Sequence, residues 1–377
     1  MVLLLNDEQK DLQKLVRNFV QKEVLPVVKQ YEEEGEMPWE LFNKVTDMGL
    51  HCMAMPEEFG GPGLDSLSHA IILEELAKGD AGFATTVGVN SLAAYPVLLS
   101  GTKQQQAAFF EIVGQGKLSA FCLTEPNAGS DAGAVATTAR RDGDEYVLNG
   151  TKCFISNGAL ASVYTVIASV DRSKGVKGLS AFIVERDRPG VSVGNEEDKM
   201  GIRTSNTCDV IFQDVRIPAG NLLGKEGEGF KIAMQALDIG RPVVGATATG
   251  VAQIALDIAV KYAKERVQFG KPIATFQAIQ FMLADMAIAV EASRSLVYQA
   301  ARLKDAGMPF TKQAAIAKTF ASDTAMKVTT DAVQILGGYG YSREYPVEKL
   351  MRDAKIMQIY EGTNQVQRIV IAGQLLS

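Results

Sequence analysis

Residues 145–184 read EYVLNGTKCFISNGALASVYTVIASVDRSKGVKGLSAFIV and contain short segments rich in Val, Ile, Phe and Tyr. The segments of this kind, here and just beyond, are Glu145–Leu148, Val163–Ser169, Leu179–Val184 and Asp209–Phe212. The turn pairs that bound them are Asp142-Gly143, Asn149-Gly150, Asn157-Gly158 and Pro189-Gly190. Short strands at this spacing, with no helices between them, predict an antiparallel sheet that forms a small barrel rather than βαβ units.

The chain before this region has the hydrophobic period of helices. Asn6, followed three residues later by Gln9, is typical of a capping box. The apolar residues that recur after it at helical spacing are Leu12, Leu15, Phe19 and Val20. We therefore expect an amphipathic helix that buries this face. Further helices are predicted at Trp39–Met48, Ser66–Lys78 and Thr102–Val113.

The chain after this region is helical again from about Gly229. The run from Ala278 to Ala306 contains neither Gly nor Pro, and Gly307 then offers a natural C-cap. A helix of this length is typical of a bundle. The predicted fold class is α+β and mainly α, with an N-terminal helical domain (1–118), a middle β-domain (119–228) and a C-terminal helical bundle (229–377).

Composition and charge exclude several classes of function. The 38 basic and 44 acidic residues give a net charge of −6, which argues against a general nucleic-acid or anionic-membrane surface. The apolar run Met1–Leu5 is too short for a signal peptide or a membrane span, so we expect a soluble protein that stays where it is made.

The metal-ligating residue types are sparse. The cysteines are Cys52, Cys122, Cys153 and Cys208, and the histidines are His51 and His69. This scatter disfavours a zinc site or a catalytic triad that uses histidine. We expect no metal, and free thiols in a reducing compartment.

Two glycine clusters do not support a nucleotide site by themselves. The segments 224–229 (GKEGEG) and 337–340 (GGYG) are not GxGxxG, and neither lies between a strand and a helix. A Rossmann site is therefore unsupported. Taken alone, both clusters are typical of turns.

Two other segments carry groups suited to chemistry. Residues 121–131 (FCLTEPNAGSD) lead from a predicted strand into a loop of hydroxyls and backbone donors, which suits a polarised heterocycle but also a well-capped turn. Residues 360–365 (YEGTNQ) place an acid beside a glycine that permits close approach of a ligand. A lone acid of this kind is also typical of a solvated surface.

Together with other motifs, these segments resemble the acyl-CoA dehydrogenase family over nearly the whole chain. The motifs that carry the resemblance are LTEPNAGSD (123–131), NGTKCFISNG (149–158), KMGIRT (199–204), RVQFGK (266–271), QILGGYGY (334–341) and MRDAKIMQIYEGTNQ (351–365). Further similarity, in GLSAFIVERDRPG and LDIGRP, is closest to the short-chain, butyryl-CoA branch. The resemblance implies a C-terminal four-helix bundle and a flavin ring that lies between the bundle and the β-domain.

The resemblance also implies roles for individual residues. Those expected to contact FAD are Phe121, Leu123, Thr124, Gly129, Ser130, Phe154, Ile155, Ser156, Arg266, Gln268, Phe269, Gln277, Gln334, Gly337, Gly338, Thr363 and Gln365. Among them, Arg266, Gln268, Phe269 and Gln277 would reach the FAD diphosphate and adenosine across a subunit interface. The residues expected to contact the acyl-CoA are Ser130, Asp238, Arg241, Tyr360 and Gly362.

The resemblance assigns the catalytic base to Glu361, which would remove the α-proton of the thioester while FAD accepts the β-hydride. The α C–H is a weak acid, so donors on the thioester carbonyl must stabilise the enolate, and the base must be desolvated. One family branch carries its base just before the arginine of the first C-terminal helix. That position is Gly240 here, so Glu361 is the remaining candidate.

The substrate is expected to be an apolar acyl-CoA. Residues 83–96 (FATTVGVNSLAAYP), which line the acyl tail in relatives, contain no Arg or Lys to pair with a dicarboxylic acyl group. Similarity to the short-chain branch favours about four carbons, while acryloyl, branched and medium chains stay open, because one methylene discriminates weakly.

The implied partners are an electron-transfer flavoprotein and further copies of the chain in a homotetramer. The expected location is the cytoplasm, or the mitochondrial matrix for a mature eukaryotic chain. Three alternatives stay open: an enoyl-CoA (crotonyl or acryloyl) reductase in an electron-bifurcating complex, an oxidase that passes electrons to oxygen, and a non-catalytic interaction protein of this fold.

Overall fold

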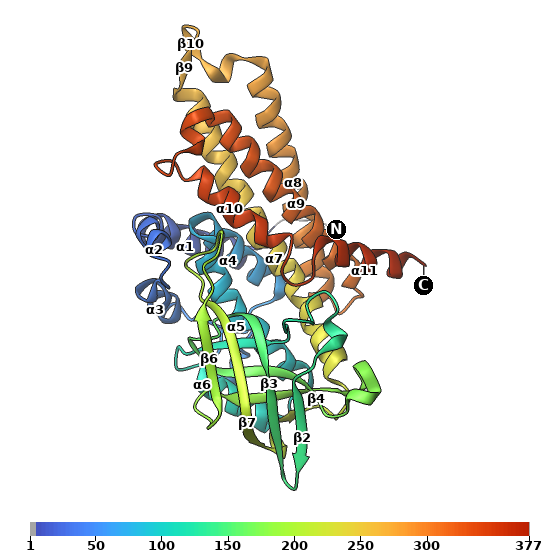
Figure 1. Cartoon of the computed structure of the whole chain (residues 1–377). Coiled ribbons are helices and arrows are strands. Elements are labelled where there is room, and N and C mark those ends of the chain that lie inside the picture. The colour runs from blue at the N-terminus through green and yellow to red at the C-terminus, as the bar shows by residue number, and fades with distance from the viewer. Residues whose placement is uncertain (1–4, 377) are drawn as a thin grey trace.

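The computed structural model describes residues 5–376 and shows a helical bundle standing on a β-sheet, with smaller helices beside their junction (Figure 1). The N-terminal helices are α1 (Asp7–Phe19), α2 (Val28–Glu34), α3 (Trp39–Asp47), α4 (Ser66–Gly79), α5 (Ala81–Ser100) and α6 (Lys103–Val113). The strands of the large sheet are β1 (Leu118–Cys122), β2 (Thr138–Asp142), β3 (Glu145–Ser156), β4 (Ala161–Ser169), β5 (Leu179–Glu185), β6 (Val191–Glu196), β7 (Thr207–Pro218) and β8 (Leu222–Leu223). The C-terminal elements are α7 (Gly229–Glu265), the hairpin β9 (Val267–Gln268) and β10 (Lys271–Pro272), α8 (Gln277–Asp305), α9 (Thr311–Leu336), α10 (Val347–Met357) and α11 (Asn364–Leu376). The predicted order of helices, sheet and helices is confirmed.

Helix α1 begins with the predicted capping box. The Gln9 backbone N–H donates to Asn6 Oδ1 at 2.7 Å, and the Asn6 backbone N–H donates to Gln9 Oε1 at 3.2 Å. The predicted inward face is wrong at one position, because Leu15 is 49% exposed while Val16 is buried. Val16 takes the inward position beside Phe19 in the core.

The large sheet is open, so the expectation of a small barrel is wrong. Its strand order runs β6-β7-β3-β2-β4-β5-β8, and no pairing in residues 5–376 joins β6 to β8. Strand β8 has only two residues before the chain leaves for α7, so it cannot continue the sheet toward closure. Most pairings are antiparallel as predicted, but β1 and β2 each pair with β4 in parallel.

The pair Asn149-Gly150 does not end a strand as predicted. Strand β3 continues through it with an irregular register between Leu148 and Gly150 against β7. Gly150 has φ 154°, and a Cβ there would lie 2.3 Å from the Thr137 hydroxyl oxygen. The glycine therefore marks a bulge with close backbone approach, which a turn signal alone cannot distinguish.

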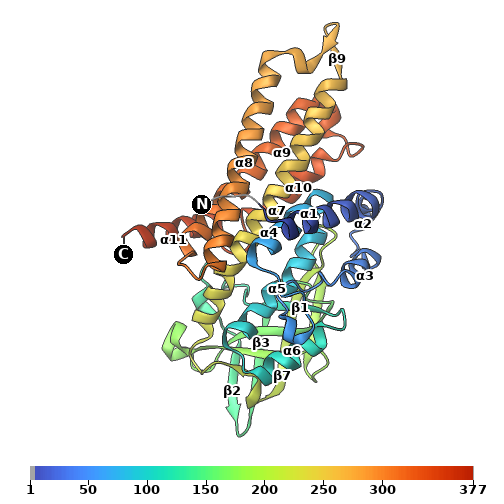
Figure 2. The same ribbon diagram turned by 180° about the vertical axis from the view of Figure 1, so that it is seen from behind.

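The C-terminal bundle consists of α7, α8, α9 and α10, with α11 packed on α9 and then projecting from the body (Figures 1 and 2). Helix α8 ends at Asp305, and Gly307 follows at φ 66°, as predicted for its C-cap. Helix α7 is continuous from the sheet to the β9–β10 hairpin at the far end of the bundle (Figure 1). It therefore connects the two ends of the molecule.

Two helices, α5 and α7, are long and apolar enough to cross a membrane by length and composition alone. However, 78% of the apolar window of α5 and 67% of that of α7 are buried inside the structure. Both are core helices here, and such helices pass the same test.

A buried charge cluster joins the three parts of the chain. Lys349 of α10 contacts Asp80, the N-cap of α5, at 2.7 Å, and also pairs with Asp353 of α10. Asp353 accepts the Ile202 backbone N–H at 2.6 Å, and the Thr204 hydroxyl donates to Asp80. Burial opposes ionisation of both carboxyls: the pKa of Asp353 is raised, while Lys349 holds that of Asp80 below its usual value.

Candidate active site

Glu361 lies in the short turn between α10 and α11, with its backbone in the left-handed region. Its φ is 52°, and that of the following Gly362 is 90°. Gln367 on α11 holds this turn, because its side-chain amide donates to the carbonyls of Glu361 and Gly362, both at 3.1 Å. A non-glycine residue in this conformation is uncommon and needs support from its surroundings.

The Glu361 carboxylate points into the protein, against the middle of α7. A Cβ added to Gly240 would lie 2.4 Å from Glu361 Oε2, so the carboxylate fills the space that a side chain at 240 would need. Glu361 Oε2 is buried, and no donor among the described residues reaches it. Burial raises the pKa of Glu361 to about 7, against the opposing positive charges of Lys318 and Arg241.

Arg241 is only 4% exposed and pairs with Asp238 one turn earlier on α7. Asp238 Oδ2 also accepts the Thr311 hydroxyl at 2.8 Å. Burial lowers the pKa of Arg241, whose charge acts on Glu361. The structure thus brings these two predicted acyl-CoA residues close to the acid; that they contact the ligand stays a prediction.

The loop after β1 is anchored from below by a buried ion pair. Lys152 of β3 has no exposed surface, and its ammonium donates to Glu125 Oε1 at 2.7 Å and to the Leu123 carbonyl at 3.0 Å. Glu125 also accepts the backbone N–H groups of Ala136 and Thr137, at 2.6 and 3.0 Å. The loop is therefore fixed at both ends, while Gly129 and Ser130 at its tip are exposed.

Strand β3 places three of the residues predicted to contact FAD, Phe154, Ile155 and Ser156, next to that loop. The Cys153 backbone N–H donates to the Thr124 carbonyl at 2.9 Å. Phe154 follows with φ 55° and a ring that is 65% exposed, whereas Ile155 is buried. An exposed aromatic ring on a strained backbone is typical of a ligand surface.

A second group of predicted FAD residues lies at the far end of the bundle, near the β9–β10 hairpin (Figure 1): Arg266, Gln268, Phe269, Gln277, Gln334, Gly337 and Gly338. A cavity of about 570 Å³ there is lined by Arg266, Gln268, Gly337, Gly338 and Tyr339, among others. The Arg266 guanidinium lies 5.3 Å from the centre of the Tyr339 ring. Thus one chain does not bring Arg266 and Gln268 to Glu361, while Thr363 and Gln365 lie directly beside it in sequence.

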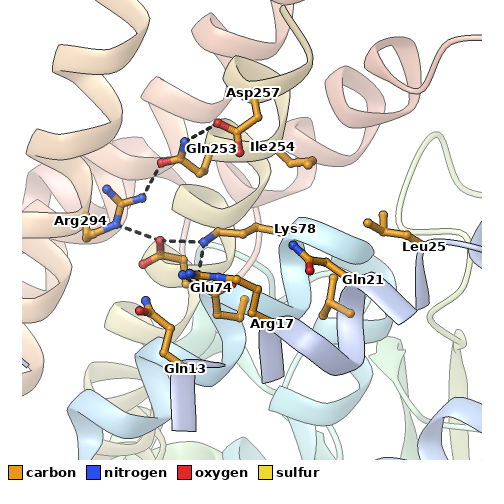
Figure 3. Close-up of a pocket in the computed structure, with 12 residues that line it drawn as sticks. Gln13, Arg17, Gln21, Leu25, Glu74, Lys78, Gln253, Ile254, Asp257 and Arg294 are labelled. Carbon is orange, nitrogen blue, oxygen red and sulfur yellow. Dashed lines mark hydrogen bonds and ion pairs between the residues drawn. The ribbon is translucent and has the colours of Figure 1, made fainter. Parts of the chain in front are cut away.

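A second cavity, of about 450 Å³, lies between α1, α4, α7 and α8 (Figure 3). Its charged side chains already pair with one another: Arg17 with Glu75 at 2.7 Å, and Arg294 with Glu74 at 2.9 Å. Lys78 also contacts both glutamates. Asp257, which also lines the cavity, accepts the Gln253 side-chain amide at 2.9 Å. These charged groups thus have partners within residues 5–376, and the cavity does not include Glu361.

Sequence reasoning missed the residues that surround the acid from behind. The turn of Glu361 accepts hydrogen bonds from Lys318 on α9 and from Gln367 on α11. The charge of Glu361 also reaches Tyr95 on α5. Burial raises the pKa of Tyr95, and the charge of Glu361 raises it further. The one available signal was Lys318, a lysine among alanines in the segment 314–325 (AAIAKTFASDTA), where a solvated face would contain more polar residues.

The described residues contain no group of three or more His, Cys, Asp or Glu side chains that could hold a metal ion. All four cysteines are buried and unpaired. The desolvated Glu361 carboxylate is therefore the candidate reactive group of this site.

Comparison with known proteins identifies the family to which this fold belongs. The N-terminal, middle and C-terminal domain profiles of acyl-CoA dehydrogenase match residues 6–117, 120–215 and 227–376. The solved butyryl-CoA dehydrogenase of Megasphaera elsdenii is 51% identical with TM-score 0.98, and each chain covers 100% of the other. A chain solved in work on the electron transferring flavoprotein of Acidaminococcus fermentans and flavin-based electron bifurcation is 50% identical with TM-score 0.98, also with 100% coverage of both.

A third relative is the acryloyl-CoA reductase (NADH) of Anaerotignum propionicum, which is 50% identical over 99% of this chain and 95% of its own. The three domain profiles and these relatives define a flavin-dependent oxidoreductase. The chain belongs to the acyl-CoA dehydrogenase family. Its cofactor is FAD.

The residues present fit this cofactor. A Cβ at Gly337 or Gly338 would meet nothing within 4 Å, so the backbone beside Arg266 is open to a diphosphate. At the other end, Gly129, Ser130 and Phe154 are exposed and therefore accessible to a flavin ring. When bound, FAD supplies the acceptor for a hydride.

Proposed function

We propose that this chain dehydrogenates a short-chain acyl-CoA at its α and β carbons, with Glu361 as the base that removes the α-proton. The observation that carries the proposal is the Glu361 carboxylate, buried against Gly240 with Oε2 unbonded. A carboxylate without a donor is free to accept a proton from carbon. Because its pKa is raised to about 7, it is also a stronger base than a solvated glutamate.

Other residues of the chain prepare this step. The Gly240 backbone leaves room for the carboxylate, and Arg241 supplies a buried positive charge that favours the ionised base. Substrate binding would remove the remaining water and strengthen these interactions. Residues Asp238, Tyr360, Gly362 and Ser130 are proposed to contact the acyl-CoA.

The acyl chain is proposed to be short, about four carbons. The butyryl-CoA dehydrogenase of M. elsdenii is half identical to this chain over its whole length. Helix α5, the proposed wall of the acyl pocket, is buried almost throughout and carries no charge. An apolar tail suits such a wall, and a terminal carboxylate would lack a partner.

We propose that the electrons pass to an electron-transfer flavoprotein. The chain is proposed to form a homotetramer and to lie in the cytoplasm. Relatedness to the chain from the A. fermentans flavoprotein work supports the partner. The separation of Arg266 from Glu361 along one chain supports an FAD site completed by a second copy.

Glu361→Gln tests the base directly. The variant keeps the shape of the side chain and should retain FAD, but an amide cannot accept the α-proton. We expect the rate of flavin bleaching by butyryl-CoA, measured anaerobically by stopped flow, to fall by roughly several orders of magnitude. Bleaching at the wild-type rate would exclude Glu361 as the base.

A second function, reduction of an enoyl-CoA in the reverse direction, is favoured by the identity to the acryloyl-CoA reductase of A. propionicum. The same base would then act as an acid that protonates the α-carbon. Steady-state rates with butyryl-CoA and with crotonyl- or acryloyl-CoA, each with an electron-transfer flavoprotein, separate the two directions.

A further inference from the structure

Lys318 is a lysine without exposed surface in the middle of α9. The other lysine of the described chain with no exposed surface, Lys152, has Glu125 at 2.7 Å, but no carboxylate in residues 5–376 lies within 4.0 Å of Lys318. Burying an ammonium without a partner is costly, so its position demands compensation from nearby oxygens and charges.

The compensation comes from the turn that carries Glu361. Lys318 Nζ donates to the Gly362 carbonyl at 2.8 Å and to Asn364 Oδ1 at 2.9 Å. The Gly362 carbonyl also accepts from Gln367, so two donors from two helices hold one peptide group. Gly362 directly follows the left-handed Glu361, so holding its carbonyl restrains the turn from which the carboxylate projects.

Among the charged groups near Lys318, Glu361 is the carboxylate that hydrogen bonds to other side chains do not already engage. The carboxylates that act on it are Glu361 and Asp323, and the cation that opposes them is Arg241. Asp323 is already engaged by Gln358, Asn364 and Arg368, at 2.7, 2.7 and 3.1 Å. Arg241 is paired with Asp238 on α7. Burial lowers the pKa of Lys318 to about 8, so it remains a cation at neutral pH.

We propose that Lys318 is a positioning residue for the catalytic base: its ammonium fixes the Gly362 peptide and supplies the buried positive charge that favours the ionised Glu361 carboxylate. The proposal deepens the function given above, since it takes Glu361 to be the base. It assigns two separable effects to one side chain, a geometric one and an electrostatic one.

Lys318→Met removes the charge and both hydrogen bonds but keeps an unbranched side chain in the buried site. We expect the variant to fold and bind FAD. The acid limb of its bleaching rate should move up by about one pH unit, because an opposite charge near a carboxyl has been removed. The rate at neutral pH should fall by about tenfold, with the KM for butyryl-CoA little changed.

The pKa of the carboxyl can also be followed without turnover, by infrared titration of the substrate-free protein. The band of Glu361 is the one lost in Glu361→Gln. In Lys318→Met this band should titrate at higher pH than in the wild type. A band and an acid limb at wild-type pH would overturn the electrostatic part.

Gln367→Met is the matched control, because it removes two hydrogen bonds from the same turn without removing a charge. It should slow bleaching without moving the acid limb upward. If Gln367→Met and Lys318→Met shifted the limb equally, loosening of the turn would explain both and the charge would have no separate role. Lys318→Gln is a second uncharged variant, for use if methionine prevents folding, and it must reproduce the upward shift.

The outcomes for the base and for Lys318 are distinct. Normal bleaching in Glu361→Gln would remove the proposed base itself. An inactive Glu361→Gln together with a normal rate and pH profile in Lys318→Met would remove only the positioning role.

Discussion

The contact between Glu361 and Gly240 explains why a particular glycine is needed inside a long helix. Glycine normally weakens a helix interior. At residue 240, however, the carboxylate occupies the space where a Cβ would begin, at 2.4 Å. A side chain at residue 240 and the carboxylate of Glu361 would therefore occupy the same space, which has room for only one of them.

Gly240→Ala should displace that carboxylate. Because the neighbouring atom is a carboxylate oxygen of the proposed base, we expect the bleaching rate to fall by about tenfold or more with FAD retained, since near-attack geometry is sensitive to small shifts. Gly373→Ala on α11 is the control, because a Cβ there meets nothing within 4 Å. Equal rates in Gly240→Ala and the wild type would show that the carboxylate has another position.

At this scale the sequence indicated the proposed base but not the residues that hold its turn. Glu361 could be assigned from its motif, and Gly240 could be excluded as a base because it has no side chain. Gln367 could not be found, because its partners are backbone carbonyls that any residue would offer. Lys318 gave only the signal of a lysine among alanines, which does not identify its partners. Such contacts depend on how α9, α10 and α11 pack, which the motif does not describe.

At the scale of elements, the loop after β1 is held by strand β3 rather than by its own sequence. The Lys152–Glu125 pair is buried, with both side chains at most 5% exposed. Burial lowers the pKa of Lys152, and Glu125 opposes that shift. Removing one member of such a pair leaves the other charge buried, which costs about 3–5 kcal/mol.

Lys152→Met should therefore lower the free energy of unfolding by about that amount and loosen the loop at Leu123. We expect a lower melting temperature and faster loss of FAD on dialysis, followed by flavin absorbance. Lys327→Met, which breaks an exposed pair with Asp331, should leave both measurements at wild-type values. If Lys152→Met kept FAD as firmly as the control, the pair would not support the cofactor loop.

Elements with strong local signals were predictable, and those set by long-range pairing were not. The capping box of α1 and the end of α8 just before Gly307 each depend on a few adjacent residues. The openness of the sheet depends instead on the shortness of β8 and on the parallel pairing of β1 with β4. Likewise, Asn149-Gly150 has the composition of a turn but forms a bulge against β7.

At the scale of the whole molecule, Lys349 connects the helical, β and bundle parts through Asp80, Asp353 and the loop at Ile202. It is the one cation paired with these two buried carboxylates in the described structure. The cluster holds α10, the start of α5 and the loop at Ile202 together. Loss of the Lys349 charge should therefore destabilise the packing of all three parts of the chain.

Lys349→Met should cost about 3–5 kcal/mol of stability at neutral pH. Without the cation, the pKa values of Asp80 and Asp353 rise above those of the unfolded chain, so the loss is greatest at neutral pH and shrinks as pH falls. Denaturant unfolding near pH 7.5 and pH 5.5 measures this. The double variant Lys349→Met/Asp353→Asn should recover part of the stability; a loss independent of pH, with no recovery, would contradict the account.

The resemblance implied that Arg266 and Gln268 belong to an FAD site shared between subunits, and one chain places them at the opposite end of the bundle from the β-domain (Figure 1). The order of the motifs along the chain cannot show this separation. Gly240, which lies against Glu361, and Arg266 belong to the same helix or its end, and the length of α7 is what places them far apart. The shared site itself stays a prediction.

The left-handed backbone at residue 361 sets activity against robustness. Glycine at residue 361 would adopt φ 52° without steric conflict and would remove a buried charge. Selection for thermal stability alone should therefore replace Glu361. The molecule thus keeps a locally unfavourable residue in the turn on which the proposed turnover depends. Heat-resistant variants obtained without selection for catalysis should be inspected first at this position.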